Sequence, residues 1–110
     1  MSQKEFIKSG KDSIRYNSIK ELNQMLKEIN KPNEYEINRA FLYKDLFLYA
    51  CKNGTREILI WFIELYYEFS VVEQIALRQI FFYGKYIATK NRQVNTNWFS
   101  NHVIPLVKNV

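Results

Sequence analysis

The chain has 110 residues, with 16 basic and 11 acidic side chains and a formal net charge of +5. This length predicts one domain, and a hydrophobic content of 47% excludes an intrinsically disordered chain. One cysteine cannot form an internal disulfide, and no apolar signal segment opens the sequence. The longest apolar run, residues 58–63, is far shorter than the roughly 20 residues of a membrane span. We therefore expect a soluble cytoplasmic protein that is neither secreted nor bound to a membrane.

The first part of the chain predicts a flexible segment followed by a helix. Residues 1–12 are polar, and we expect them to be flexible, with a single helical domain over residues 13–110. Ser18 and Glu21 have the spacing of a capping box, and apolar residues then recur at helical intervals. Pro32 ends this helix, because the residue before a proline avoids helical geometry.

A second and a third helix are predicted around a short turn. The second begins with the capping pattern of Asn33 and Glu36 and runs to about Lys52, with these inward candidates: Ile37, Phe41, Leu48 and Cys51. Asn53-Gly54 predicts a left-handed helix end. The third helix, residues 56–68, starts after Thr55 and is apolar nearly all round. It is therefore predicted to be either the central helix or one that exposes an aromatic patch.

The last part of the chain predicts two more helices. Ser70 and Glu73 form a third capping pattern, and the helix behind them runs to about Thr89. Its spacing predicts the following inward residues: Val72, Ile75, Ala76, Ile80, Tyr83 and Ile87. A polar loop over residues 90–96 then leads to a short helix, residues 97–103. The predicted fold is all-α, with about five antiparallel helices joined by short turns.

One stretch resembles a known repeat family. Residues 50–58 read Ala-Cys-Lys-Asn-Gly-Thr-Arg-Glu-Ile and are followed by Leu-Ile-Trp-Phe-Ile. Over residues 40–70 this pattern is similar to an ankyrin repeat, and most similar to the divergent ankyrin-like repeats of large DNA viruses. A weaker second unit would place Gly84 where Gly54 stands in the first. The resemblance implies a viral, protein-binding mini-solenoid of helix-turn-helix units.

The charge is unevenly distributed along the chain. Residues 32–74 carry a net charge of −3, whereas residues 75–110 contain five basic side chains and no carboxylate. Arg78 and Lys85 are seven residues apart and share one side of their predicted helix, and Lys90 and Arg92 follow them. Such cations, with aromatic rings nearby, could contact phosphates and bases. A solvated basic surface or an acidic protein partner is the alternative explanation.

The sequence contains little that indicates catalysis. Cys51 and His102 are the only residues that could form a Cys–His pair, and Cys51 fits a packing role better. One cysteine and one histidine make a zinc site improbable on ligand number. No glycine-rich phosphate loop is present. We expect a protein that is not an enzyme, with no catalytic residues, cofactor, metal or small-molecule substrate.

The aromatic side chains suggest a binding surface. A small domain cannot easily bury all the rings of residues 61–86, so some are predicted to form an interface. Trp61 and Tyr67, on the outer side of the third helix, are the candidates. The sequence thus predicts a helical interaction module that binds a protein partner, or itself as a homodimer, through an aromatic face with a basic rim. The alternative is a small nucleic-acid-binding protein.

Overall fold

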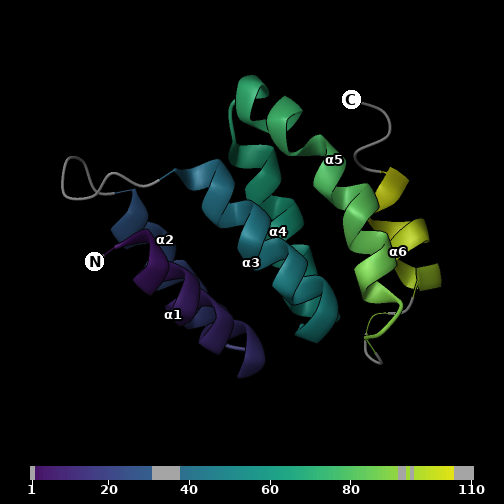
Figure 1. Ribbon diagram of the computed structural model, residues 1–110, viewed down its shortest axis with the longest axis horizontal. Helices are drawn as coiled ribbons and strands as arrows, with labels where there is room; N and C mark the ends of the chain where they lie inside the picture. The colour runs from purple at the N-terminus through teal and green to yellow at the C-terminus, as the bar shows by residue number, and fades with distance from the viewer. Residues whose placement is uncertain (1, 31–37, 92–93, 95, 106–110) are drawn as a thin grey trace.

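The protein is described by a computed structural model, which covers residues 2–30, 38–91, 94 and 96–105. Within these residues the chain is all-helical, as predicted, and forms no strand. The helices are α1 (Gln3–Arg15), α2 (Ile19–Ile29), α3 (Arg39–Asn53), α4 (Arg56–Glu68), α5 (Val71–Ala88) and α6 (Thr96–His102). Figure 1 shows α3 in the middle of the molecule, with α1 and α2 on one side and α5 and α6 on the other.

Helix α3 is central because glycines let two neighbouring helices approach it closely. A Cβ atom at Gly10 of α1 would lie 2.6 Å from a methyl carbon of Leu46, and one at Gly84 of α5 would lie 2.8 Å from Sγ of Cys51. Both distances are shorter than side-chain contacts allow. The two glycines therefore set how closely α1 and α5 pack against α3.

Aromatic rings from four helices meet at the centre of the core. The ring of Phe47 on α3 lies 4.9 Å from Phe81 of α5, 5.9 Å from Phe62 of α4 and 6.3 Å from Phe99 of α6, measured between ring centroids. The edge-on or tilted geometry of these pairs is the favoured arrangement for aromatic rings. This cluster joins the two halves of the chain into one core.

The N-terminal segment differs from the prediction. Residues 3–15 form α1, which begins at Ser2 and buries Phe6 and Ile14 to 1% exposure. Its inward residues recur every three or four positions, but they include Gly10 and Ser13, so hydrophobicity alone does not show the face. Residues 3–12, which were expected to be flexible, therefore belong to a helix that packs into the core.

Helix α1 ends in a Schellman motif that the sequence analysis did not predict. Asn17 adopts a left-handed backbone conformation with φ 55°, and the N–H of Ser18 donates to the carbonyl of Ser13 at 2.8 Å. The N–H of Asn17 also donates to the carbonyl of Ile14, which completes the motif. Because Ser18 is also the N-cap of α2, this motif fixes the angle between α1 and α2.

Three predicted helix starts are confirmed. The hydroxyl oxygens of Ser18, Thr55 and Ser70 accept hydrogen bonds from backbone N–H groups three residues later. At Ser70 the capping box is complete, because the Glu73 carboxylate accepts from the Ser70 N–H. At Ser18 it is half formed, since Glu21 accepts a hydrogen bond from Ser13 instead.

The start and end of α3 differ from the predictions in detail. The Asn33–Glu36 capping pattern and Ile37 lie outside the described residues, and Asn38 is the N-cap of α3. Phe41, predicted to face inward, is 47% exposed, whereas Cys51 is buried as predicted. Gly54 is extended, with φ −89°, and not left-handed. A Cβ atom there would lie 2.7 Å from the carbonyl oxygen of Ala50, so close approach is what requires glycine.

The loop after α5 is anchored by a buried side chain. Nδ2 of Asn91 donates to the carbonyl of Cys51 at 3.1 Å and to that of Gly54 at 2.8 Å, and Oδ1 accepts from the N–H of Val94. Asn91 thereby satisfies carbonyl groups at the end of α3 that no helical N–H can reach. The predicted polar loop over residues 90–96 thus contains a residue that holds the last helix against α3.

Candidate functional site

Among the described residues, most of the exposed large hydrophobic side chains lie on α5. Its exposed face, here called the outer face, includes Val72 (77% exposed), Ile75 (65%), Tyr83 (65%) and Tyr86 (77%). At about 100° per residue these positions line up along one side of the helix. At 1.5 Å per residue, the outer face from Val72 to Tyr86 is about 21 Å long. Surfaces of this kind mark interaction sites in soluble proteins.

The spacing predicted that Val72, Ile75 and Tyr83 of this face point inward, whereas all three are exposed. Of the predicted inward residues, Ile80 is buried and Ile87 is half-buried, whereas Val72, Ile75, Ala76 and Tyr83 are exposed. The buried face consists of Leu77, Ile80, Phe81, Gly84 and Ala88. Apolar residues occupy both the buried and the outer face of α5, so their spacing does not select the buried one. The small side chains do, since Gly84 and Ala88 allow the close approach to α3.

An open groove runs beside the outer face, between α1, α3 and α5. Three lysines line it, Lys11, Lys52 and Lys90, together with three tyrosines, of which Tyr83 and Tyr86 belong to the outer face. The ammonium of Lys11 lies 5.4 Å from the ring centroid of Tyr49, the third tyrosine. Asp45 is the one acidic residue in the lining. The groove is thus positively charged and aromatic.

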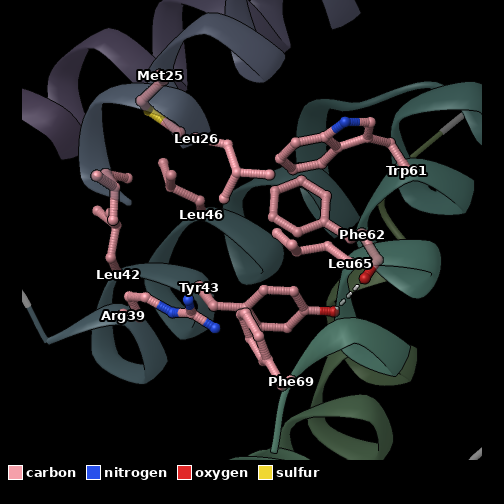
Figure 2. Close-up of a pocket in the computed structure, with 11 residues that line it drawn as sticks. Met25, Leu26, Arg39, Leu42, Tyr43, Leu46, Trp61, Phe62, Leu65 and Phe69 are labelled. Carbon is pink, nitrogen blue, oxygen red and sulfur yellow. Dashed lines mark hydrogen bonds between the residues drawn. The ribbon is translucent and has the colours of Figure 1, made fainter. Parts of the chain in front are cut away.

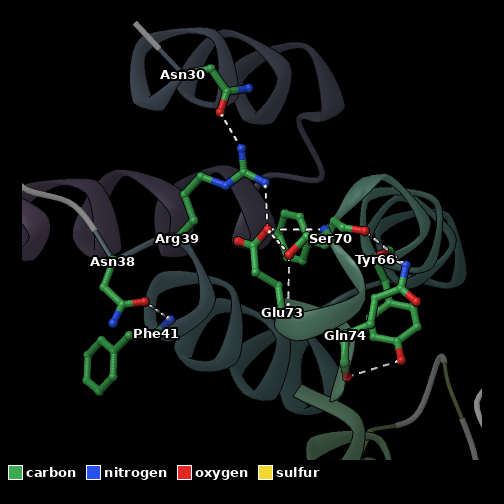
Figure 3. Close-up of polar contacts among 9 residues, drawn as sticks. Asn30, Asn38, Arg39, Phe41, Tyr66, Ser70, Glu73 and Gln74 are labelled. Atoms are coloured by element: carbon green, nitrogen blue, oxygen red, sulfur yellow. Dashed lines mark hydrogen bonds and ion pairs between the residues drawn. The ribbon is translucent and has the colours of Figure 1, made fainter. Parts of the chain in front are cut away.

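Polar contacts hold the N-terminal end of α5 in place. Figure 3 shows Glu73 between Ser70 and Arg39. The Glu73 carboxylate accepts a hydrogen bond from the N–H of Ser70, and its Oε1 lies 3.6 Å from Nη2 of Arg39 on α3. The Arg39 guanidinium also donates to Oδ1 of Asn30 at 3.1 Å and lies over the ring of Phe69. These contacts link the ends of α2 and α4 to the starts of α3 and α5. The outer face is therefore carried by a fixed helix.

A small, partly open cavity lies between α2, α3 and α4, and Figure 2 shows its lining. The lining is almost wholly apolar, and Oη of Tyr43 donates beside it to the carbonyl of Phe62 at 2.6 Å. The volume is about 30 Å³, whereas small-molecule sites have roughly 300–1,000 Å³. The cavity is therefore a packing gap in the core.

The aromatic anchors predicted on α4 have different environments. Trp61 is half-buried against α2, where Nε1 donates to Oδ1 of Asn23 at 2.8 Å, and its ring packs edge-on against Phe62. Tyr67 is 50% exposed and contacts the ring of Tyr66. The two residues are six positions apart in a helix and point to different sides. They do not form one surface, and the outer face of α5 is the larger aromatic surface.

The predicted basic residues separate into two places. Arg78 and Lys85 are half-buried along one side of α5, next to the outer face. Lys90 lies on the other side, in the groove with Lys11 and Lys52, which the sequence analysis did not select. Arg92 lies outside the described residues. Lys11 and Lys52 were missed because they belong to helices remote in sequence, and only the packing of α1 and α5 on α3 brings them to Lys90.

The Cys–His pair does not have the environment of a nucleophilic site. Cys51 is fully buried, and burial raises the pKa of its thiol well above the ordinary value, so the thiol stays protonated. His102 is exposed on α6, where Nδ1 lies 2.9 Å from the carbonyl oxygen of Trp98 and the two rings stack. In the part of the chain that the structure describes, no cluster of acidic, Cys and His side chains could hold a metal.

No helix within the described ranges has the length and apolar character needed to cross a membrane.

Comparisons of the chain with protein-family models, with curated proteins and with solved structures gave no match. The function proposed below therefore rests on the outer face of α5 and on the groove beside it.

Proposed function

We propose that the chain is a non-enzymatic helical interaction module that binds a protein partner through the outer face of α5, with basic side chains at its rim. The observation that carries the proposal is a surface about 21 Å long on which Val72, Ile75, Tyr83 and Tyr86 are each at least 65% exposed. Keeping so much apolar surface in water is unfavourable, by about 25 cal/mol per Å². A partner that covers it recovers that free energy.

Two further features support this proposal. Helix α5 is held at both ends, by the Ser70–Glu73 capping box at its start and by Asn91 after its end, so it presents a preorganised surface. The connection between α3 and α4 is only Gly54-Thr55, which suits the ankyrin-like hairpin proposed for residues 40–70. Gly84, however, lies inside α5 and not at a turn, so the proposal includes one such unit. The buried free thiol of Cys51 suits a reducing cell interior.

The proposal is tested by site-specific photo-crosslinking. A photoreactive phenylalanine analogue is placed at Ile75 on the outer face or at Ile60, which is exposed on α4, and each protein is irradiated in extract of its source cells. We expect a discrete adduct from position 75 and none from position 60. An equal yield from both positions, or none from position 75, would refute binding through α5.

Nucleic-acid binding is the second candidate, and the lysine- and tyrosine-lined groove favours it. Exposed Tyr83 and Tyr86 could stack on bases while Lys11, Lys52 and Lys90 contact phosphates. Fluorescence anisotropy with a single-stranded oligonucleotide across a salt series tests this function. Three phosphate contacts predict a slope of about −2 for log K against log salt. Absence of binding at low salt would exclude it.

A further inference from the structure

The charges around the outer face indicate the chemistry of its partner, and this inference rests on the proposed function. The outer face itself is uncharged, because Val72, Ile75, Gln79, Tyr83 and Tyr86 succeed one another along it. Cations flank it on both sides. Arg78 and Lys85 lie about 100–120° from the line of the face on one side, by helix geometry. The groove with Lys52 and Lys90 lies along the other side.

Few acidic groups oppose these cations. The sequence has no carboxylate after Glu73, and Asp45 is the one acidic residue among those that line the groove. Within the described residues, Arg78, Lys85, Lys52 and Lys90 take part in no ion pair. The rim therefore carries positive charge that no carboxylate of the described residues pairs with, and an acidic partner would neutralise it.

The shape of the surface favours a helix as the occupant. The outer face is a ridge on which two aliphatic side chains and two tyrosines project on either side of Gln79, and a groove runs beside its C-terminal half. An amphipathic helix laid along such a ridge can bury its apolar side chains between those of α5. Val72 and Ile75 are aliphatic, so the N-terminal half of the face offers packing to a protein and no stacking platform to a base.

The same charges oppose pairing with a second copy. In a two-fold antiparallel pair of α5 helices, each side of one helix meets the same side of the other. Arg78 would then lie near the same arginine of the second copy, because it is one residue from the centre of the outer face at Gln79. Like charges at that position oppose association.

We propose that the outer face of α5 binds an amphipathic helix whose apolar stripe is flanked by carboxylates. The carboxylates contact Arg78 and Lys85 on one side and Lys52 and Lys90 on the other. The apolar stripe supplies the contact area, and the ion pairs select the partner and its direction.

The test uses three fluorescent 18-residue helical peptides with the same leucine stripe, flanked by Glu, Gln or Lys. Binding to the full chain is measured by anisotropy at 50 mM salt, and circular dichroism confirms that each variant folds. We expect the Glu-flanked peptide to bind at least tenfold more tightly than the Gln-flanked peptide. Lys90→Glu and Lys85→Glu should each weaken its binding at least fivefold. Lys44→Glu, the same charge change at an exposed site outside the groove, should alter it less than twofold.

Ile75→Ser distinguishes this inference from the proposed function. If Glu- and Gln-flanked peptides bind equally and Ile75→Ser weakens both, α5 binds proteins but charge does not select them, and the inference is overturned. Failure of all three peptides overturns the inference, while the crosslinking result decides the proposed function. Single-stranded DNA that displaces the Glu-flanked peptide at lower concentration would make nucleic acid the occupant. A dimer that is seen by light scattering and is lost in Ile75→Ser would show that a second copy of the chain occupies the outer face. Either result overturns the inference.

Discussion

Replacement of Asn91 by alanine tests how the last part of the chain is held against α3. Asn91 is 8% exposed, and its side chain makes hydrogen bonds to Cys51, Gly54 and Val94. Each buried hydrogen bond contributes about 1 kcal/mol, and a group left without a partner costs more. We therefore expect Asn91→Ala to lower the free energy of unfolding by about 2–4 kcal/mol.

Urea unfolding followed by circular dichroism measures this loss. With a slope of about 2 kcal/mol per molar urea, the midpoint should fall by about 1–2 M. Asn91→Asp is the informative second variant, because it keeps the acceptor for Val94 but turns a carboxylate oxygen toward the two carbonyls. It should be at least as destabilising as the alanine. Asn101→Ala, at an exposed residue of α6, is the control and should change stability by less than about 0.5 kcal/mol. A loss below about 0.5 kcal/mol for Asn91→Ala would refute the reasoning.

Three other predictions concern stability and are measured in the same way. Gly84→Ala should lower the free energy of unfolding by about 1–3 kcal/mol, because its Cβ atom would overlap Sγ of Cys51; a stabilised variant would contradict this packing. Ser70→Ala should cost about 1 kcal/mol through loss of the capping box with Glu73, and an unchanged midpoint would show that the cap contributes nothing. Burial raises the pKa of Cys51, so the unfolded thiol ionises first as pH rises. The thiol's contribution is fully present below about pH 8.5 and is then lost by up to about 1.4 kcal/mol per pH unit. In urea titrations between pH 8 and pH 10, the free energy of unfolding should fall less for Cys51→Ala than for the wild-type chain. An identical fall in both proteins would show that the Cys51 thiol is exposed to water.

Local signals predicted three of the helix starts, because capping depends on residues within one turn. Ser18, Thr55 and Ser70 were all identified in this way, and each accepts the predicted hydrogen bond. Helix α1 was missed because two of its inward residues, Gly10 and Ser13, are not hydrophobic. Gly10 is buried by its approach to Leu46 of α3, which lies far along the chain.

The candidate site was predictable in kind but not in position. Aromatic excess and the acid-free C-terminal third indicated a binding surface with basic charge, and Lys85 and Lys90 remain part of it. Binding through Trp61 and Tyr67 stays a prediction; within the described residues Trp61 contacts α2, and more of the exposed large hydrophobic side chains lie on α5 than on α4. Helix α5 has apolar residues on both its buried and its outer face, so their spacing does not show which face is buried. Contact at Gly84 with α3 decides which side is buried.

The division of α5 into two faces also makes the chain a ready scaffold for engineering. The residues that hold the helix in the fold, Leu77, Phe81, Gly84 and Ala88 among them, are separate from those on its outer face. A library that randomises the positions of Val72, Ile75, Gln79, Tyr83 and Tyr86 would therefore vary recognition while leaving the core unchanged. Natural variants could diversify by the same route, with new specificities arising on a helix whose attachment stays constant.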